Sequence, residues 1–345
     1  MNEAAALLSW YRRNRRDLPW RRTRDPWAIW VSEVMLQQTR VDHVVAYFGP
    51  FLERFSAVSS LAEAPLQDAL ARWSGLGYYR RLRLLHRAAQ RVMEDGGTIP
   101  SSAERLRRLP GVGDYTAAAV ASIAFGEQVP VLDGNVARVM ARRLACDEDI
   151  ARPAVRRRLR DAAAGLLDAA APGDSNQALM ELGATLCAPA APRCGDCPLA
   201  RGCAARAQGT PESYPRRAKK VPPRLVSLVI AVVERGDRVL LFRRADHEVL
   251  LAGTWELPWA EANNGAAEDA LATRYGGSFA LGCELGRVRH AITTRRLVAT
   301  VRRGDFIAGD AVAEGREAAW VAREDVTSLP TSSLVRKALA LTTTR

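Results

Sequence analysis

The stretch Leu109–Val139, LPGVGDYTAAAVASIAFGEQVPVLDGNVARV, decides the fold of the first half of the chain. It opens with Pro110-Gly111-Val112-Gly113, and glycine accepts the positive φ of a tight turn at little steric cost. Residues 103–109 and 116–125 have helical patterns, so we expect two helices joined by this turn. Backbone N–H groups at such a turn suit a phosphate oxygen. The alternative is a turn without a ligand.

A carboxylate follows about twenty residues later. Asp133 lies in Leu132-Asp133-Gly134-Asn135-Val136, just before another helical pattern. Aspartate at this place is either the N-cap of the next helix or a reactive group held close to the phosphate-binding turn. The segment by itself leaves both interpretations open.

A second acid stands out in residues 27–40, WAIWVSEVMLQQTR, which we expect to form a helix. Glu33 is the polar exception in its apolar half, with Trp30, Val34 and Gln37 nearby at helical spacing. A carboxylate among apolar neighbours has a raised pKa and can therefore act as a general acid. The alternative is a surface glutamate on an amphipathic helix.

The composition favours a polyanionic partner. The chain has 345 residues, enough for two domains, and its 50 basic and 38 acidic residues give a net charge of +12 and a pI near 10.0. The N-terminus lacks the apolar core of a signal peptide, and no run is long enough to span a bilayer. We therefore expect a cytoplasmic protein that binds nucleic acid and makes no membrane contact.

Two tyrosines precede a strongly basic helical segment. Gly75-Leu76-Gly77-Tyr78-Tyr79 is a predicted loop, and the basic helix is expected over residues 80–93. Aromatic side chains next to arginines suit stacking on bases beside phosphate contacts. The alternative is that both tyrosines pack in the core.

Four cysteines lie close together in a loop that contains proline and glycine. Cys187, Cys194, Cys197 and Cys203 have the spacing C-x6-C-x2-C-x5-C. In a cytosolic chain this pattern indicates a metal site rather than disulfides. Tetrahedral zinc and a 4Fe–4S cluster both accept four thiolates, so the chemistry alone does not choose between them. Cys146 and Cys283 stand apart, and we expect both to be buried.

The pattern changes after the cysteines. Residues 1–206 have no convincing strand, and residues 207–224 are rich in proline and basic side chains, as in a linker. Beyond them the expected elements are two strands joined at Arg235-Gly236-Asp237, a helix and two further strands: residues 225–233, 238–243, 269–275, 297–301 and 318–321. An α+β domain over residues 225–345 is therefore predicted.

With these residues in view, the chain resembles the MutY-type adenine DNA glycosylases of the helix-hairpin-helix base-excision superfamily. The likeness covers nearly the whole chain and rests on seven motifs: Leu18-Pro19-Trp20, Ser32-Glu33-Val34-Met35-Leu36-Gln37-Gln38-Thr39, Gly75-Leu76-Gly77-Tyr78-Tyr79, Gly111-Val112-Gly113, Leu132-Asp133-Gly134-Asn135-Val136, Glu181-Leu182-Gly183 and the cysteine loop. The resemblance implies a multidomain fold, in which an all-α glycosylase domain with an iron–sulfur loop at residues 187–203 precedes a Nudix-like α+β domain. It also implies that the four cysteines hold one 4Fe–4S cluster.

The resemblance further implies a chemistry for the two acids. Adenine opposite 8-oxoguanine or guanine in double-stranded DNA is flipped out, and Glu33 protonates its N7. Asp133 stabilises the oxocarbenium ion or bonds to it, and Asn135 fixes the geometry of the pair. Family positions that line the adenine pocket match Leu18, Trp20, Arg21 and Glu181. Those that contact DNA match Gln38, Thr39, Tyr78, Gly111, Val112 and Gly113, and we expect the enzyme to act as a monomer.

Tyr115 separates this chain from a related branch. In endonuclease III the residue two positions after the glycine turn is a lysine that forms a Schiff base and cuts the strand. A phenol cannot form an imine, so the resemblance implies a glycosylase without strand cleavage.

Two departures concern the second domain. The family's lesion-reading loop, Phe-Ser-His, aligns with Ile292-Thr293-Thr294, so only His290 before the loop and the Thr293 hydroxyl remain as candidate lesion contacts, with Thr294 beside them. Residues 253–258, GTWELP, resemble the start of a Nudix box, but the downstream acidic ligands for magnesium are absent. A Nudix hydrolase is therefore disfavoured, and a non-catalytic DNA-binding protein is the other alternative.

Overall fold

The computed structural model describes residues 2–216, 222–245, 247–248, 251–262, 267–292, 295–307 and 317–342. The chain divides into two compact units. The helical unit comprises Met1–Glu63 and Leu84–Lys219, and the sheet unit comprises Ala64–Arg83 and Lys220–Arg345. A short segment from the first half of the chain, Ala64–Arg83, therefore belongs to the sheet unit. The expected domain limits at residues 206 and 225 stay a prediction.

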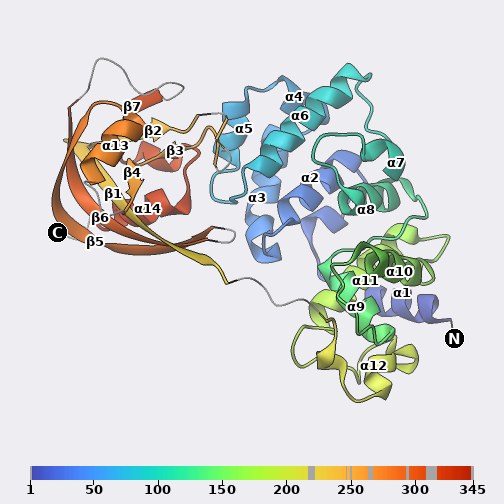
Figure 1. Ribbon diagram of the computed structural model, residues 1–345. Coiled ribbons are helices and arrows are strands. Elements are labelled where there is room, and N and C mark those ends of the chain that lie inside the picture. The colour runs from blue at the N-terminus through green and yellow to red at the C-terminus, as the bar shows by residue number, and fades with distance from the viewer. Residues whose placement is uncertain are drawn as a thin grey trace. The chain divides into compact units, whose positions relative to one another are not determined.

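Helices account for the regular structure of the first 207 residues, as the absence of a strand pattern predicted (Figure 1). The helices are α1 (Glu3–Asn14), α2 (Pro26–Leu36), α3 (Val41–Arg54), α4 (Val58–Glu63), α5 (Leu66–Arg72), α6 (Arg80–Glu94), α7 (Ala103–Leu106), α8 (Asp114–Phe125), α9 (Gly134–Arg143), α10 (Pro153–Ala164), α11 (Pro172–Thr185) and α12 (Ala204–Ala207). Of these, α5 and the first turn of α6 belong to the sheet unit.

Helix α2 is shorter than expected. Asp25 caps its start by accepting hydrogen bonds from the amides of Trp27 and Ala28, and Pro26 suits the first helical position. The helix ends at Leu36 rather than at residue 40, because Gln38 adopts a left-handed conformation with φ of 58°. The DNA-contact candidates after Leu36 are thus held in a turn.

The predicted hairpin is present between α7 and α8. Gly111 has φ of 75°, and a Cβ there would lie 2.6 Å from the Cβ of Leu84, so this turn requires glycine. Helix α8 follows, with a nearly continuous buried surface, and Gly126 ends it at φ of 74°.

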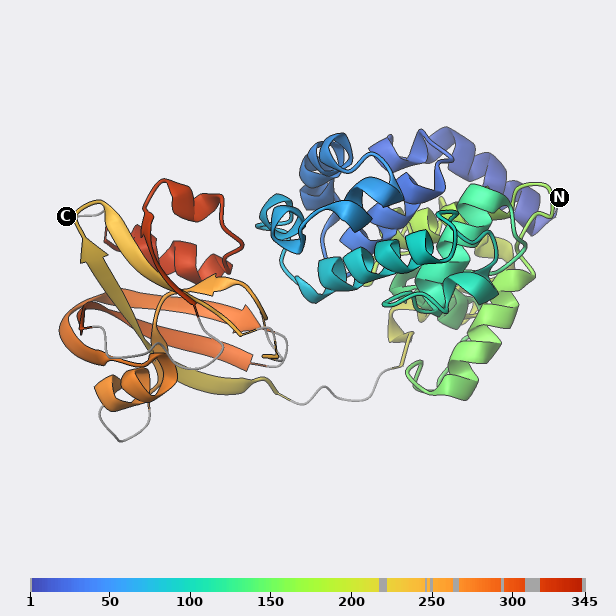
Figure 2. The ribbon, with the colours of Figure 1, turned by 90° about the horizontal axis from the view of Figure 1, so that it is seen from above.

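The sheet unit is built on one mixed sheet of seven strands (Figures 1 and 2). Its order is β3-β2-β1-β6-β5, with β4 beside β1 and β7 beside β2, and the β1–β6 pair is parallel. The strands are β1 (Arg224–Arg235), β2 (Arg238–Arg243), β3 (Trp255–Glu256), β4 (Trp259–Glu261), β5 (Ser278–Ile292), β6 (Arg295–Ile307) and β7 (Glu317–Ala322).

Two apolar clusters cover the two faces of this sheet. Alternate residues of β1 enter different clusters, because successive side chains of a strand point to opposite faces. Helix α14 (Ser333–Ala340) packs Val335 on one face, and α13 (Ala267–Tyr275) packs Leu271 on the other. The expected α+β architecture is confirmed.

Strand β5 was not predicted, although it is the longest of the sheet. Its sequence, SFALGCELGRVRHAI, lacks a sustained apolar alternation because much of it faces solvent. Cys283 lies on this strand and is exposed, so the expectation that it is buried is wrong. Cys146 is buried as expected, at 3% exposure.

Candidate active site

Glu33 is a buried acid in the middle of α2. Its side chain is 4% exposed, and the Tyr115 hydroxyl from α8 donates a hydrogen bond to its Oε2 atom. Burial raises the pKa of Glu33 to about 7, an effect that the negative charge of Asp133 adds to and the Tyr115 hydrogen bond opposes. At neutral pH about half of the Glu33 side chains therefore carry a proton. The alternative of an exposed surface glutamate is excluded.

Asp133 is both a helix cap and a neighbour of Glu33. One carboxylate oxygen accepts the amide of Val136 at 2.6 Å, which caps α9, and the other accepts the Asn135 side-chain amide at 2.9 Å. Burial raises the pKa of Asp133, and these donors oppose the rise. The two interpretations of Asp133 are thus compatible, since capping fixes the carboxylate that faces Glu33.

Both acids line one cavity of about 220 Å³ in the helical unit. It gathers five more predicted site residues, which are Leu18, Trp20, Arg21, Thr39 and Glu181, and the two residues that hold the acids, Tyr115 and Asn135. Other lining residues include Arg16, Gln177 and Met180, which sequence reasoning did not single out. The predicted chemistry requires that two acids reach one nucleotide. Glu33 and Asp133 line the same cavity, which is compatible with this requirement.

Glu181 differs from the other acids of the cavity because two arginines neutralise it. Arg16 donates to both carboxylate oxygens at 2.9 and 2.7 Å, and Arg21 adds a bond of 2.8 Å. Burial opposes the ionisation of Glu181, but these hydrogen bonds outweigh it and hold its pKa at about 2. Arg16 had no recognisable sequence signal, since it lies in an extended segment after α1 and no helical or strand pattern places it.

The rear wall of the cavity depends on a close approach of α11 to α9. Gly183 permits it, because a Cβ there would lie 2.6 Å from the Cβ of Asn135. The Asn176 side chain, fully buried on α11, accepts the Val131 amide at 2.9 Å and donates to the Val129 carbonyl at 2.9 Å. These contacts fix the backbone that leads into Asp133.

Arg138 connects the cavity wall to the cysteine loop. Its guanidinium donates to Asn135 Oδ1 at 3.0 Å, to the Gly183 carbonyl at 2.7 Å and to the Cys187 carbonyl at 2.8 Å. Arg138 and Arg142 are both buried in α9, although no feature of the sequence singled them out.

The four cysteines line one small cavity, together with the buried Arg142. Burial raises the pKa of Cys197 to about 11, and the other three thiols add to the rise because they lie close to it. Arg142 donates to Cys187 Sγ at 3.2 Å. Among the described residues, no group of three or more ligands converges on a single ion. Four thiols around one cavity are ligands that either a zinc ion or an iron–sulfur cluster accepts.

The DNA-contact candidates of the helical unit lie outside the cavity, apart from Thr39. Gly111 and Gly113 are exposed in the hairpin, whereas Val112 is 8% exposed. Gln38 is exposed and left-handed, a strained conformation that is common at functional sites. Tyr78 lies in the sheet unit, is 43% exposed and also has positive φ, at 51°.

Comparisons with known proteins agree with this geometry. Residues 31–164 match the family model of the HhH-GPD superfamily base excision DNA repair proteins, and residues 228–341 match the NUDIX domain model. The adenine DNA glycosylase of Mycobacterium tuberculosis is 45% identical over 217 residues, which are 62% of this chain and 71% of that relative.

The chain belongs to the adenine DNA glycosylase family.

The chain is also similar to adenine DNA glycosylases of animals and to a solved glycosylase structure. The adenine DNA glycosylase of Homo sapiens is 40% identical over 308 residues, or 73% of this chain and 56% of the human protein. The chain spans a little over half the length of the human, rat and mouse relatives that it matches. Among solved structures, a thermostable thymine-DNA glycosylase shares 29% identity with a TM-score of 0.55, over 59% of this chain and 95% of that one.

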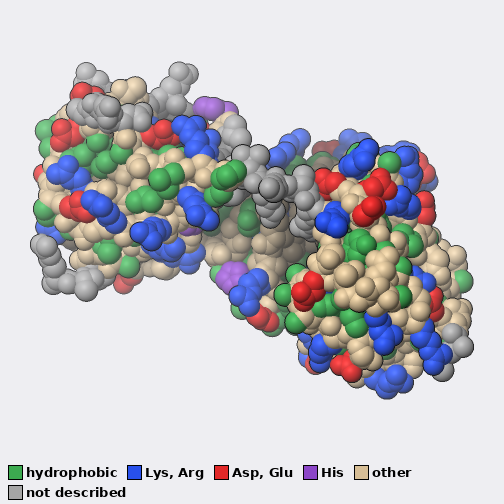
Figure 3. All heavy atoms as spheres, turned by 60° about the horizontal axis from the view of Figure 1, so that its bottom comes forward, with side chains coloured by type: hydrophobic (Ala, Val, Ile, Leu, Met, Phe, Trp, Pro, Cys, Tyr) green, Lys and Arg blue, Asp and Glu red, His purple; other side chains and the backbone are tan. Residues whose placement is uncertain are grey.

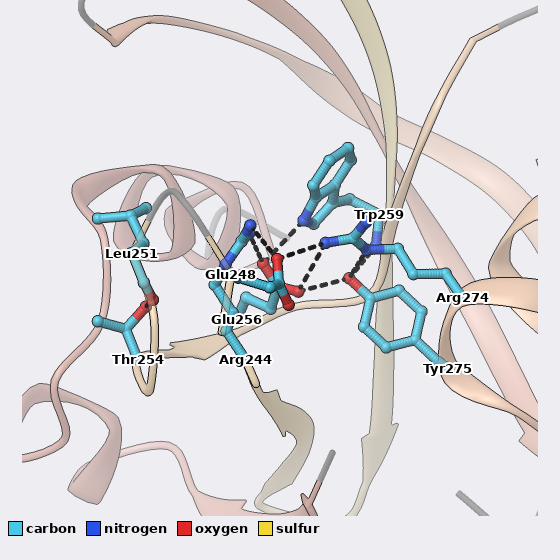
Figure 4. Close-up of polar contacts among 8 residues, drawn as sticks. All are labelled: Arg244, Glu248, Leu251, Thr254, Glu256, Trp259, Arg274 and Tyr275. Carbon is cyan, nitrogen blue, oxygen red and sulfur yellow. Dashed lines mark hydrogen bonds and ion pairs between the residues drawn. The ribbon is translucent and has the colours of Figure 1, made fainter. Parts of the chain in front are cut away.

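The sheet unit of this family member holds a second group of buried acids (Figure 4). Glu256, in the segment that resembles a Nudix box, accepts hydrogen bonds from Tyr275 at 2.9 Å and Trp259 at 2.8 Å and pairs with Arg244. Arg274 lies 3.5 Å from Glu256, with its guanidinium 4.1 Å from the centre of the Trp259 ring. Arg244 and Arg274 thus pair with the acidic side chains of this group.

The lesion-reading candidates are only partly described. His290 lies near the end of β5, pairs with Leu297 and is half-buried. Burial lowers its pKa, and the positive charge of Lys337 adds to this. Thr293 and Thr294 lie outside the described residues.

Basic side chains are frequent on the surface, as the net charge of +12 leads one to expect (Figure 3). On the face drawn in Figure 3, Lys and Arg side chains are spread over both units, with Asp and Glu between them. None of the described helices combines the length and the apolar character that crossing a bilayer requires.

Proposed function

We propose that this chain is a DNA glycosylase that excises adenine opposite 8-oxoguanine or guanine in double-stranded DNA. The single observation that carries the proposal is the cavity in which Glu33, with a pKa of about 7, faces Asp133. An acid that is half protonated at neutral pH beside a second, hydrogen-bonded carboxylate is the arrangement that glycoside cleavage needs. Names of relatives with 40–45% identity support the choice of adenine.

Glu33 is the general acid. The flipped adenine enters the cavity, and the proton of Glu33 passes to N7 of the base. The electrons of the N-glycosidic bond then move into the purine, which leaves as a neutral base. Tyr115 keeps its own proton, because burial and the negative charge of Glu33 raise its pKa well above the usual value. Its hydroxyl therefore stabilises the Glu33 carboxylate that forms as the proton leaves.

Asp133 acts on the sugar. Cleavage leaves an oxocarbenium ion, which the Asp133 carboxylate stabilises by its charge or by a transient covalent bond. Asn135 holds this carboxylate through its amide, and Arg138 holds Asn135 in turn. Water completes the reaction, with the ionised Glu33 as its base, and the proton lost by water restores the acid.

The remaining cavity residues bind the base. Leu18 and Trp20 supply apolar surface, and Trp20 is fixed by an edge contact with Phe48 at 5.5 Å between ring centres. Arg21 and Glu181 supply polar groups whose positions are set by their mutual ion pair. A prearranged pair of this kind costs no reorganisation when the base arrives.

The hairpin and the two left-handed residues hold the DNA. The exposed amides at Gly111 and Gly113 lie at the start of α8, where the helix dipole favours a phosphate. Val112 supports the turn from within, and Thr39 lies at the edge of the base cavity. Gln38 and Tyr78 are the wedge residues that fill the stack when adenine leaves it.

One 4Fe–4S cluster is the cofactor that the cysteine loop fits best, with Cys187, Cys194, Cys197 and Cys203 as its ligands. Bound there, a cluster supplies covalent cross-links that order the loop. Arg142 orients this segment, since its guanidinium also donates to the carbonyls of Ala188 and Pro189 at 2.7 and 2.9 Å. A brown protein that absorbs in the visible blue is expected, whereas a colourless zinc-loaded protein would contradict the assignment.

The decisive experiment measures adenine excision under single-turnover conditions from duplexes with 8-oxoguanine or guanine opposite the adenine. We expect abasic-site formation from both, faster opposite 8-oxoguanine, with strand breaks only after alkali treatment. The Thr293→Ala variant tests whether the altered loop still reads the lesion, since only the 8-oxoguanine substrate should slow. Absence of excision from every duplex by protein with a full cluster would overturn the proposal.

A further inference from the structure

The loop that carries Tyr78 is rigid despite its glycines. The carbonyl of Gly77 accepts two side-chain hydrogen bonds, from Trp73 at 3.0 Å and from Arg81 at 3.2 Å. The Arg81 guanidinium also lies 5.3 Å from the centre of the Tyr78 ring, on the flank of the proposed wedge. These contacts hold an exposed aromatic ring on a backbone with positive φ. A backbone conformation of this kind costs free energy and persists only where the surrounding structure fixes it.

The next residue anchors this loop to the Nudix-like part of the sheet unit. Tyr79 is 3% exposed, and its hydroxyl donates to the Thr331 carbonyl at 2.8 Å. Ser74, on the other side of the loop, donates to the Leu329 carbonyl at 3.1 Å. Thr331 is itself tied to the sheet through a bridge with Trp255 in β3. Two hydrogen bonds, one on each side of the loop, therefore join it to residues 329–331 in the C-terminal half of the chain.

The two tyrosines thus divide their tasks. Tyr78 presents its ring to solvent, whereas the Tyr79 side chain is buried and its hydroxyl donates to the Thr331 carbonyl. Because they are adjacent, any displacement of Tyr79 changes the backbone torsions that aim Tyr78. The hydrogen bond of Tyr79 thus orients Tyr78 and takes no part in the reaction itself.

We propose that Tyr79 is a positioning residue through which the Nudix-like part of the chain aims the Tyr78 wedge. This inference rests on the proposed excision of adenine from DNA. The bond between the Tyr79 hydroxyl and the Thr331 carbonyl fixes the loop before DNA binds, so the wedge enters the stack without first having to be ordered. Loss of the bond lets the left-handed Tyr78 relax toward ordinary torsions, and flipping becomes slower.

A double-mutant cycle tests the inference. Tyr79→Phe removes only the hydroxyl, and Tyr78→Ala removes the wedge. We expect Tyr79→Phe to slow single-turnover excision roughly tenfold, the factor that one buried hydrogen bond can supply. In the Tyr78→Ala background the same substitution should slow excision less than about twofold, because no wedge remains to be aimed. Fluorescence of 2-aminopurine next to the target adenine reports the flipping step directly and should show the same pattern.

The matched control is Tyr275→Phe, which also deletes a buried hydroxyl bond within the sheet unit, but one made to the Glu256 side chain rather than to the Thr331 carbonyl. Its excision rate should stay at the parent value. Ser74→Ala, which removes the weaker second bond, should have a smaller effect than Tyr79→Phe. Equal slowing by Tyr79→Phe in both backgrounds, or no slowing in either, would overturn the inference while leaving the glycosylase proposal intact. A parent protein without excision would instead refute the proposed function.

Discussion

The two units of this chain both bury carboxylates, but the side chains that hold these carboxylates differ in charge. In the helical unit, Glu33 accepts a hydrogen bond from the neutral Tyr115, and no arginine of the described residues hydrogen-bonds to it. In the sheet unit, Glu256 is held by Arg244, Tyr275, Trp259 and Arg274 (Figure 4). Burial without a hydrogen-bonded arginine raises the pKa of Glu33 to about 7, whereas the Glu256 carboxylate is paired with arginines.

Glu181 shows the same contrast inside a single cavity. It lines the same space as Glu33, yet its two arginines hold its pKa at about 2 against a value of about 7 for Glu33. Glu181 accepts hydrogen bonds from two arginines and Glu33 from none of the described arginines, and this difference accounts for the opposite directions of their pKa shifts. Changing the partners of each acid is the way to test this distinction.

The largest effect is expected for Glu33→Gln. An amide of the same shape cannot deliver a proton, so single-turnover excision should fall by about three orders of magnitude. Affinity for a duplex that contains the mispair should change little, because the substitution removes a partly protonated group and no phosphate contact. Binding by fluorescence anisotropy and excision by gel assay separate the two quantities. Retained turnover would place the acid elsewhere.

Much of this site was predictable from sequence, for identifiable reasons. Glu33 stood out because a charged side chain in an apolar helix segment breaks the pattern, and Asp133 because a cap before a helix has a defined position. Their convergence could be inferred from the family resemblance but not from spacing, since 99 residues of chain separate Glu33 from Asp133. Arg16 and Gln177 line the cavity only through tertiary packing, which leaves no local trace.

The sheet unit was harder to predict than the helical unit. Strand β5 exposes most of its length and so lacks an apolar alternation. The transfer of Ala64–Arg83 to the sheet unit had no sequence signal, because α5 looks like any other short amphipathic helix. Contacts made by backbone carbonyls, such as that of Thr331 with Tyr79, carry no residue preference at the accepting position.

A smaller but still large loss is expected for Gly183→Ala. The new Cβ would lie 2.6 Å from the Cβ of Asn135 and would push α9 and α11 apart, which displaces the residue that holds Asp133. We expect excision to fall about 30-fold, within the range that misplacement of a catalytic group produces. Thermal unfolding should show a loss of stability although alanine is the better helix former by about 1 kcal/mol.

Gly49→Ala is the matched control for that variant. Gly49 also lies within a helix, α3, but a Cβ there meets no atom within 4 Å. This variant should be as active as the parent, whereas its stability should change little because an alanine before Pro50 disfavours the helical conformation and offsets the better helix propensity. Equal behaviour of the two alanine variants would mean that the contact between α11 and Asn135 does not matter for the site.

The third prediction concerns pH and Tyr115. Glu33 must be protonated to act, so single-turnover excision should be maximal below pH 7 and fall about tenfold per pH unit well above it. The Tyr115 hydrogen bond lowers the pKa of Glu33, so Tyr115→Phe should raise that pKa and move the alkaline limb to higher pH. Its maximal rate should fall about tenfold, because the carboxylate formed at N7 protonation loses its donor.

The Tyr115→Lys variant tests whether an amine at this position introduces strand cleavage. A lysine there replaces the phenol with an amine that can form an imine with the sugar, so some strand cleavage and borohydride trapping on DNA are expected. A pH profile of Tyr115→Phe that coincides with the parent profile would refute the assignment of Glu33 as the titrating acid.

The smallest effect on excision is expected for Glu256→Gln in the sheet unit. The substitution removes the charge that Arg244 and Arg274 share, while Glu248 stays paired with both. We expect a stability loss of about 2 kcal/mol, measured by urea unfolding, because a buried network loses one ionic partner and keeps another. Excision by the folded variant should equal that of the parent, since both acids of the proposed mechanism belong to the helical unit. Excision that falls as steeply as for Glu33→Gln would instead show that the arginine-bound carboxylates take part in the reaction, and the contrast between the two units would then fail.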